Sequence, residues 1–180
     1  MRVITGKARG VVLKTPEGMA TRPTTDRVKE ALFNIIQFDI PTARVLDLFG
    51  GTGQLGIEAL SREAKSAVFV DEREEACRLI RENLRRTKLE QFGRVIRSDY
   101  MAYLRTCKEK FDIILLDPPY AEVFLENSLK MITEIDILQS GGIIVAERPI
   151  GKELPWEVPG YSRSRDYKYG KTLITIYRKL

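Results

Sequence analysis

The feature that most constrains the fold of this chain is a regular alternation of short apolar runs with segments whose apolar residues recur at helical spacing. The predicted strands are ARVLDLF, SAVFVD, GRVIRSD, FDIILLD and GGIIVAER. Strands that are apolar almost throughout are typical of sheets buried on both faces. Strands that alternate with helices pair in parallel through right-handed crossovers. We therefore predict an α/β fold with a doubly wound, Rossmann-like parallel sheet.

The two ends of the chain differ from this pattern. The segment RVITGKARGVVLKTP predicts two short strands around a glycine-rich turn, a β-hairpin with Lys7 and Arg9 at its tip. The segment SRSRDYKYGKTLITIYR predicts an antiparallel hairpin that closes the sheet. We divide the chain into an N-terminal hairpin appendage over residues 1–20 and a single domain over residues 21–180.

Each of the first four predicted strands runs into an acidic residue. These residues are Asp47, Asp71, Asp99 and Asp117. In open α/β sheets, ligands bind at the carboxyl ends of the strands, so the four carboxylates should meet at one rim. Like charges crowded together destabilise a fold unless a ligand uses them. The pattern therefore indicates a binding site for a molecule rich in hydrogen-bond donors or positive charge.

The loop after the first strand, LDLFGGTGQLG, satisfies the G-x-G-x-x-G pattern from Gly51 onward, and Asp71 follows at the distance expected of a ribose ligand. An NAD-dependent oxidoreductase is therefore one reading. Two features count against it. Asp47 precedes the glycines and would repel a pyrophosphate, and one sheet leaves little chain for a second, substrate-binding region.

S-adenosylmethionine fits the same residues better. Its ammonium group suits Asp47, and its carboxylate suits backbone N–H groups at the start of a helix. Its ribose hydroxyls suit Asp71, and its adenine amine suits Asp99, with Tyr100 beside the ring. The sulfonium is a cation, which an acidic rim accommodates.

The segment Asp117-Pro118-Pro119-Tyr120 follows the fourth predicted strand. Proline fixes φ and holds the preceding residue in an extended conformation, so the Asp117 carboxylate and a proline carbonyl form a stiff pair of acceptors. Such acceptors can take the two N–H bonds of a nucleobase amine and orient its lone pair toward a methyl donor. The Tyr120 ring can stack on an extruded base. The bland alternative is a surface turn after a buried strand.

Charge is distributed unevenly along the chain, which has a net charge of +5. Residues 1–30 carry seven basic and three acidic side chains, residues 161–180 carry six and one, and the middle nets −4. Basic ends are a footprint of nucleic-acid binding, although solubility alone also explains them. The candidate RNA-binding residues are Lys7, Arg9, Arg163, Arg165, Lys168 and Lys171.

Composition excludes several classes of protein. The chain has no histidine, which excludes a Ser-His-Asp triad and a histidine-ligated zinc, and we expect no metal. Its two cysteines form no C-x-x-C pair, and neither a signal peptide nor a membrane-spanning run is evident. We therefore expect a cytoplasmic protein with no membrane partner.

Two motifs of this chain resemble those of class I S-adenosylmethionine-dependent methyltransferases that modify exocyclic amines. One is the glycine loop from Asp47 to Gly53, which includes Phe49 and Thr52, and the other is Asp117–Tyr120. The whole chain resembles the bacterial small-subunit ribosomal RNA guanine-N2 methyltransferases of the RsmD type. The resemblance covers ITGKARGVVLKTP, RPTTDRVKEALFNII, VLDLFGGTGQLGIEALSREA, VFVDE, DIILLDPPY and YGKTLITIY. RPTTDRV is the most discriminating of these elements.

The resemblance implies a seven-stranded sheet with an antiparallel last strand, S-adenosylhomocysteine as the product, and ribosomal RNA, possibly within the small subunit, as the partner. It implies cofactor contacts at Asp47, Phe49, Gly51, Thr52, Gly53, Asp71, Glu72, Asp99 and Tyr100, and places Arg22, Pro23, Thr24 and Thr25 near the methionine end. It implies a catalytic loop at Asp117, Pro118, Pro119 and Tyr120. An N6-adenine methyltransferase and an RNA-binding module without activity remain as alternatives.

Overall fold

A single sheet forms the centre of the computed structural model, which describes residues 1–18, 23–119 and 122–180. Within these residues eight strands are ordered β3-β2-β1-β4-β5-β8-β6, and β7 also pairs with β8. The first five strands in this order are parallel, as the apolar runs predict. The strands are β1 (Arg44–Asp47), β2 (Ser66–Asp71), β3 (Gly93–Arg97), β4 (Phe111–Leu116), β5 (Leu138–Pro149), β6 (Tyr161–Arg163), β7 (Tyr167–Tyr169) and β8 (Thr172–Lys179).

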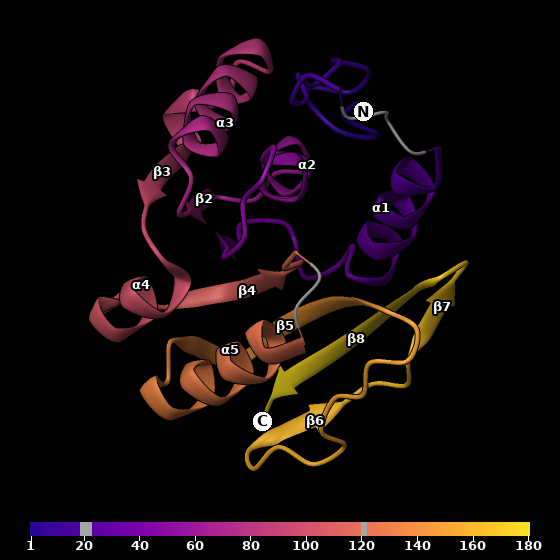
Figure 1. The fold of residues 1–180 in the computed structure, drawn as a ribbon, viewed down its shortest axis with the longest axis vertical. Helices are drawn as coiled ribbons and strands as arrows, with labels where there is room; N and C mark the ends of the chain where they lie inside the picture. The colour runs from indigo at the N-terminus through magenta and orange to yellow at the C-terminus, as the bar shows by residue number, and fades with distance from the viewer. Residues whose placement is uncertain (19–22, 120–121) are drawn as a thin grey trace.

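Helices cover both faces of the sheet (Figure 1). The side chains of Val45 and Phe69 point to one face and join a buried cluster with the first three helices. Those of Leu46 and Val70 point to the other face and join a cluster with the last two. The helices are α1 (Pro23–Ile35), α2 (Gln54–Ser61), α3 (Glu74–Arg86), α4 (Tyr100–Thr106) and α5 (Glu122–Ile135), with a 3₁₀ turn at Glu90–Phe92.

The parallel register brings the acidic strand ends together, as predicted. Asp47 is the last residue of β1 and Asp71 the last of β2, while Asp117 directly follows β4. Asp99 lies two residues beyond β3 and caps α4. Gly56 on α2 permits the helix to lie close to the sheet, because a Cβ there would meet the Phe69 ring at 2.3 Å.

The C-terminal strands close the sheet in antiparallel fashion, as expected, but the edge strand is divided. Arg163 pairs with Tyr177 and Tyr167 with Ile174, so four residue steps on the edge oppose three on β8. The extra residue is a β-bulge. It turns Asp166 toward the guanidinium groups of Arg148 and Arg163, at 2.9 and 3.1 Å. The predicted strand therefore appears as β6 and β7, and the sheet has eight strands instead of seven.

The predicted N-terminal hairpin is not formed as two strands. Residues 1–18 hold one isolated antiparallel bridge, between Arg2 and Val12. The N–H groups of Ile4 and Thr5 donate to the Glu58 carboxylate of α2 instead, at 2.8 and 3.1 Å. This side-chain competition diverts two donors from a strand ladder. The division of the chain at residue 20 stays a prediction.

Candidate active site

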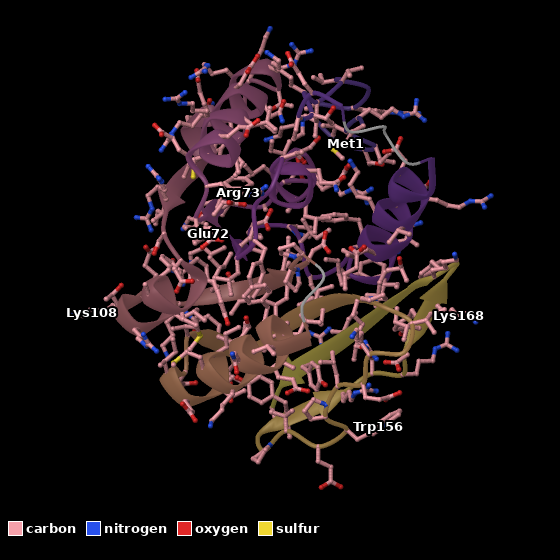
Figure 2. All side chains as sticks on the ribbon, in the orientation of Figure 1. Met1, Glu72, Arg73, Lys108, Trp156 and Lys168 are labelled. Carbon is pink, nitrogen blue, oxygen red and sulfur yellow. The ribbon has the colours of Figure 1, made fainter. Side chains whose placement is uncertain are left out.

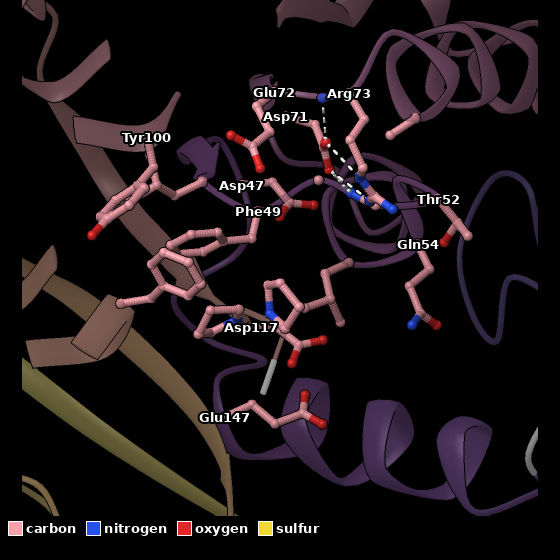
Figure 3. Close-up of a pocket in the computed structure, with 18 of the residues that line it drawn as sticks. Asp47, Phe49, Thr52, Gln54, Asp71, Glu72, Arg73, Tyr100, Asp117 and Glu147 are labelled. Atoms are coloured by element: carbon pink, nitrogen blue, oxygen red, sulfur yellow. Dashed lines mark hydrogen bonds and ion pairs between the residues drawn. The ribbon is translucent and has the colours of Figure 1, made fainter. Parts of the chain in front are cut away.

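A pocket of about 630 Å³ opens at the carboxyl ends of the parallel strands (Figure 3). Its volume is that of a typical small-molecule site. Most of the residues predicted for the cofactor and the target amine line it. They are Asp47, Phe49, Gly51, Thr52, Asp71, Glu72, Asp99, Tyr100, Asp117, Pro118 and Pro119.

Asp47 lies at the floor of this pocket and is 1% exposed. Its Oδ2 accepts the N–H of Gly56 at 3.1 Å, whereas its Oδ1 is buried with no hydrogen-bond partner. Burial raises the pKa of Asp47 to about 8, and the charges of Asp117 and Asp71 add to the shift. A buried carboxylate oxygen without a donor fits the ammonium group of S-adenosylmethionine, which would satisfy it.

Both carboxylate oxygens of Asp71 already accept hydrogen bonds from within the protein. Oδ1 accepts the N–H and Nε of Arg73, and Oδ2 accepts the N–H of Gly51 and Nη2 of Arg73, at 3.0 to 3.2 Å. A carboxylate has about four acceptor sites, so ribose hydroxyls could reach Asp71 only by displacing the Arg73 side chain. The Arg73 side chain is 65% exposed, whereas the Asp71 side chain is 8% exposed, so Arg73 is the partner that can swing out into solvent.

An aromatic wall stands beside Asp99. The Phe49 and Tyr100 rings lie 5.2 Å apart, and Phe124 lies 5.9 and 5.2 Å from them. One Asp99 oxygen caps α4 by accepting the N–H of Ala102 at 3.0 Å. A flat apolar ring system beside a carboxylate suits a purine with an exocyclic amine. Phe124 was not predicted, because nothing in an amphipathic helix marks one aromatic side chain as facing a pocket.

A second carboxyl group, Glu147 near the end of β5, accompanies Asp117 in the pocket. Figure 3 shows the two carboxyl groups facing each other. Burial raises the pKa of Asp117 to about 6 and that of Glu147 to about 8, and the Asp117 charge adds to the second shift. The sequence reasoning missed Glu147, although the rule that identified four acids at strand ends applies equally to the fifth strand.

Some predicted site residues lie elsewhere or outside the described residues. Gly53 precedes α2 with φ of 83°, a conformation that favours glycine, and is not among the lining residues. Arg22 and Tyr120 lie outside the described residues, so their roles stay predictions. Pro23, Thr24 and Thr25 form the first turn of α1, and their side chains lie outside the description too.

The candidate RNA-binding cations fall into two groups. Five are exposed: Lys7, Arg9, Arg165, Lys168 and Lys171. Arg163 is a correction. Its side chain is 2% exposed, with the guanidinium 3.8 Å from the Trp156 ring centre and paired with Asp166, so it cannot reach a phosphate.

Two kinds of feature are absent from the described residues. No helix there is both long enough and apolar enough to cross a membrane. In the same residues no group of three or more Cys, Asp or Glu side chains is placed to hold a metal ion.

Comparison with known proteins gives matches along the whole chain. Residues 1–178 match the family described as conserved hypothetical protein 95. A Bacillus subtilis protein named "Putative rRNA methyltransferase YlbH" is 42% identical over 99% of both chains. The Escherichia coli "Ribosomal RNA small subunit methyltransferase D" is 32% identical over 99% of this chain and 90% of its own.

A solved structure agrees with these matches. The Escherichia coli protein titled "Putative methyltransferase yhhF" superposes with a TM-score of 0.89 at 30% identity, over 99% of this chain and 97% of its own. The pocket, its acidic rim and these likenesses lead to one conclusion. The chain belongs to the conserved hypothetical protein 95 family, the RsmD-like class I methyltransferases that use S-adenosylmethionine.

Proposed function

We propose that this methyltransferase transfers a methyl group to the exocyclic N2 amine of a guanine in small-subunit ribosomal RNA. The observation that carries the proposal is the Asp117 carboxyl group. It lines the cofactor pocket next to Pro118 and Pro119 and receives no hydrogen bond from any described residue. The name of the Escherichia coli relative supplies the class of RNA.

The cofactor-binding roles follow from the pocket. Asp47 would bind the ammonium group through its unpartnered Oδ1. Asp71 would bind the ribose after Arg73 moves aside, with Glu72 beside it. Asp99 would accept the adenine amine. When bound, S-adenosylmethionine supplies an electrophilic methyl group and leaves as S-adenosylhomocysteine.

The chain then has to orient a weak nucleophile. The lone pair of a nucleobase amine is delocalised into the ring, so the amine attacks a methyl group poorly. Asp117 and the Pro118 carbonyl would accept its two N–H bonds and direct the lone pair out of the ring plane. Because both acceptors are held by the strand end and by proline, little reorganisation is needed during the reaction. Tyr120 would stack on the base.

The RNA itself would be held by the exposed cations at both ends of the chain. Lys7 and Arg9 lie in the N-terminal segment, and Lys168 and Lys171 lie around the turn between β7 and β8. Thr172, next to Lys171, lines the pocket, so this turn adjoins the pocket mouth. Such phosphate contacts position an RNA without reading its sequence.

The test is tritium transfer from labelled S-adenosylmethionine to small ribosomal subunits that lack guanine-N2 methylation, followed by mapping of the labelled nucleotide. The proposal predicts label on the N2 amine of one guanine. Label on an adenine N6 amine would replace it with the adenine alternative. Parallel reactions with stripped ribosomal RNA decide whether the assembled particle is required.

A further inference from the structure

Asp117 and Glu147 are neighbours across two parallel strands. Leu116 of β4 pairs with Ala146 of β5, and both side chains are buried on the face of α4 and α5. Asp117 directly follows Leu116, and Glu147 follows Ala146 on β5, so both side chains turn to the opposite face, into the pocket. Figure 3 shows their carboxyl groups directed toward each other.

Neither carboxyl group has a counter-ion or a hydrogen-bond donor among the described residues. Arg148 is next to Glu147 in sequence, but its guanidinium lies on the other face and pairs with Asp166 at 2.9 Å. A partly buried carboxylate without a donor destabilises a fold. A third carboxyl group, that of Asp47, has a buried oxygen without a partner in the same pocket, which indicates that the site is built for a ligand with donors.

Among the described groups around Glu147, Asp117 is the charged group that interacts with it. From β8, Ile174 lies opposite Glu147 and Thr172 lines the pocket, and neither carries a charge. On α1, Lys29 pairs with Glu58, and Asp26 pairs with Arg2. From β1 the pocket receives the carboxyl group of Asp47, whose pKa the Asp117 charge also raises. Among the residues that the structure describes, Asp117 is the charge that raises the pKa of Glu147, in addition to burial.

We propose that Glu147 is a positioning residue for methyl transfer, which acts through Asp117 by forming with it a carboxyl pair that shares one proton and takes up the proton of the methylated amine. The proposal rests on the proposed amine methylation and holds for any nucleobase amine. Two neighbouring carboxyl groups in a desolvated site titrate as a pair, because the second ionises against the charge of the first.

As the amine nitrogen bonds to the methyl carbon, the carbon–sulfur bond breaks and its electrons stay on sulfur. The nitrogen becomes positive and gives an N–H proton to the Asp117 carboxylate, while the N–H electrons return to nitrogen. Glu147 then releases its own proton to solvent, so the pair again holds one proton. Burial raises the pKa of both groups, and the Asp117 charge raises that of Glu147 further, so the pair begins each cycle with one proton.

The first measurement needs no RNA. Carboxyl carbons of labelled protein are titrated by NMR in wild type and in Glu147→Gln. We expect two coupled steps in wild type, and a single Asp117 step in Glu147→Gln. Glu147→Asp should keep two steps. Independent titration of both groups near pH 4 would overturn the proposal.

The second measurement is the pH profile of single-turnover methyl transfer on the RNA substrate. We expect Glu147→Gln to be about 10-fold slower at pH 7 and to lose the alkaline step of the profile, with S-adenosylhomocysteine affinity within about 2-fold of wild type. Glu153→Gln, an exposed change outside the pocket, is the control. An unchanged rate and profile would overturn the proposal. If NMR shows the coupled titration of Asp117 and Glu147 but the tritium label is on a base other than guanine, the proposed substrate is wrong and the proposed carboxyl pair is retained.

Discussion

At the scale of single residues, the site depends on carboxyl groups that the fold holds in an unfavourable environment. Asp47, Asp117 and Glu147 all have raised pKa values because they are buried without enough donors. Burying these carboxyl groups lowers the stability of the ligand-free protein and leaves acceptors available to a ligand. A cationic cofactor and a donor-rich amine are the ligands that restore the missing interactions.

The stability cost of burying Asp47 can be tested through its dependence on pH. Its pKa in the folded protein is about 8, above its value in the unfolded chain, so the folded state binds more protons between pH 4 and pH 8. Stability must therefore fall as pH rises through that window. Asp47→Asn should stabilise the protein relative to wild type at pH 8, by on the order of 1–3 kcal/mol, with a smaller difference at pH 4.5. It should also weaken S-adenosylmethionine binding.

Urea unfolding at the two pH values measures the effect. Asp112→Asn is the control, since Asp112 lies on β4 outside the pocket and pairs with Arg44 at the surface. If Asp47→Asn destabilised the protein equally at both pH values, the raised pKa would have to be abandoned.

At the scale of helices and strands, the sequence predicted an element correctly where its pattern of apolar and polar residues alone determines the structure. The five parallel strands, and the acids that follow the first four, were predicted from apolar runs and from the side on which such sheets bind ligands. The sequence did not predict an element correctly where contacts between side chains distant in sequence determine the structure. Asp166, where the edge strand divides, pairs with Arg148 of β5. This pairing has no periodic signal.

The N-terminal segment shows the same limit and leads to a second prediction. Glu58 is fully buried and receives Ile4 and Thr5 N–H groups, with Lys29 and Arg62 at 3.5 and 3.1 Å. Glu58→Gln would leave Lys29 buried without a carboxylate. We expect a loss of about 3 kcal/mol in the free energy of unfolding. Val3 and Leu13 belong to the same core, so deleting the segment would disturb the fold as well.

Urea unfolding of Glu58→Gln measures this loss. Glu134→Gln on α5 is the matched control, because Glu134 is exposed and should change stability by less than about 0.5 kcal/mol. An unfolding curve for Glu58→Gln that overlays wild type would show that the N-terminal segment is not anchored by this carboxylate.

At the scale of the whole molecule, the charge distribution predicts how RNA is held. The chain nets +4 over residues 1–30 and +5 over residues 161–180, against −4 between them. Figure 2 places Lys168 and Lys108 at opposite edges of the molecule, with Met1 between them in the upper part. Reversing Lys168 and Lys171 to glutamate should therefore weaken RNA binding and reduce its dependence on salt concentration, with cofactor affinity retained.

The control for this change is Lys108→Glu, a single exposed charge reversal at the far edge. RNA affinity is measured across a salt series for each variant, and the combined change Lys7→Glu and Arg9→Glu tests the N-terminal segment in the same way. Equal salt slopes in wild type and in both charge-reversed variants would mean that the RNA surface lies elsewhere.

In the proposed reaction, Asp117 serves the target amine and not the cofactor. One paired measurement on Asp117→Ala tests this role: single-turnover methyl transfer together with S-adenosylhomocysteine affinity by calorimetry. Asp112→Ala on β4 is the control. We expect Asp117→Ala to slow methyl transfer by at least about 100-fold, while its cofactor affinity stays within about 3-fold of wild type. Methyl transfer at the wild-type rate, or loss of cofactor binding in step with activity, would contradict this role.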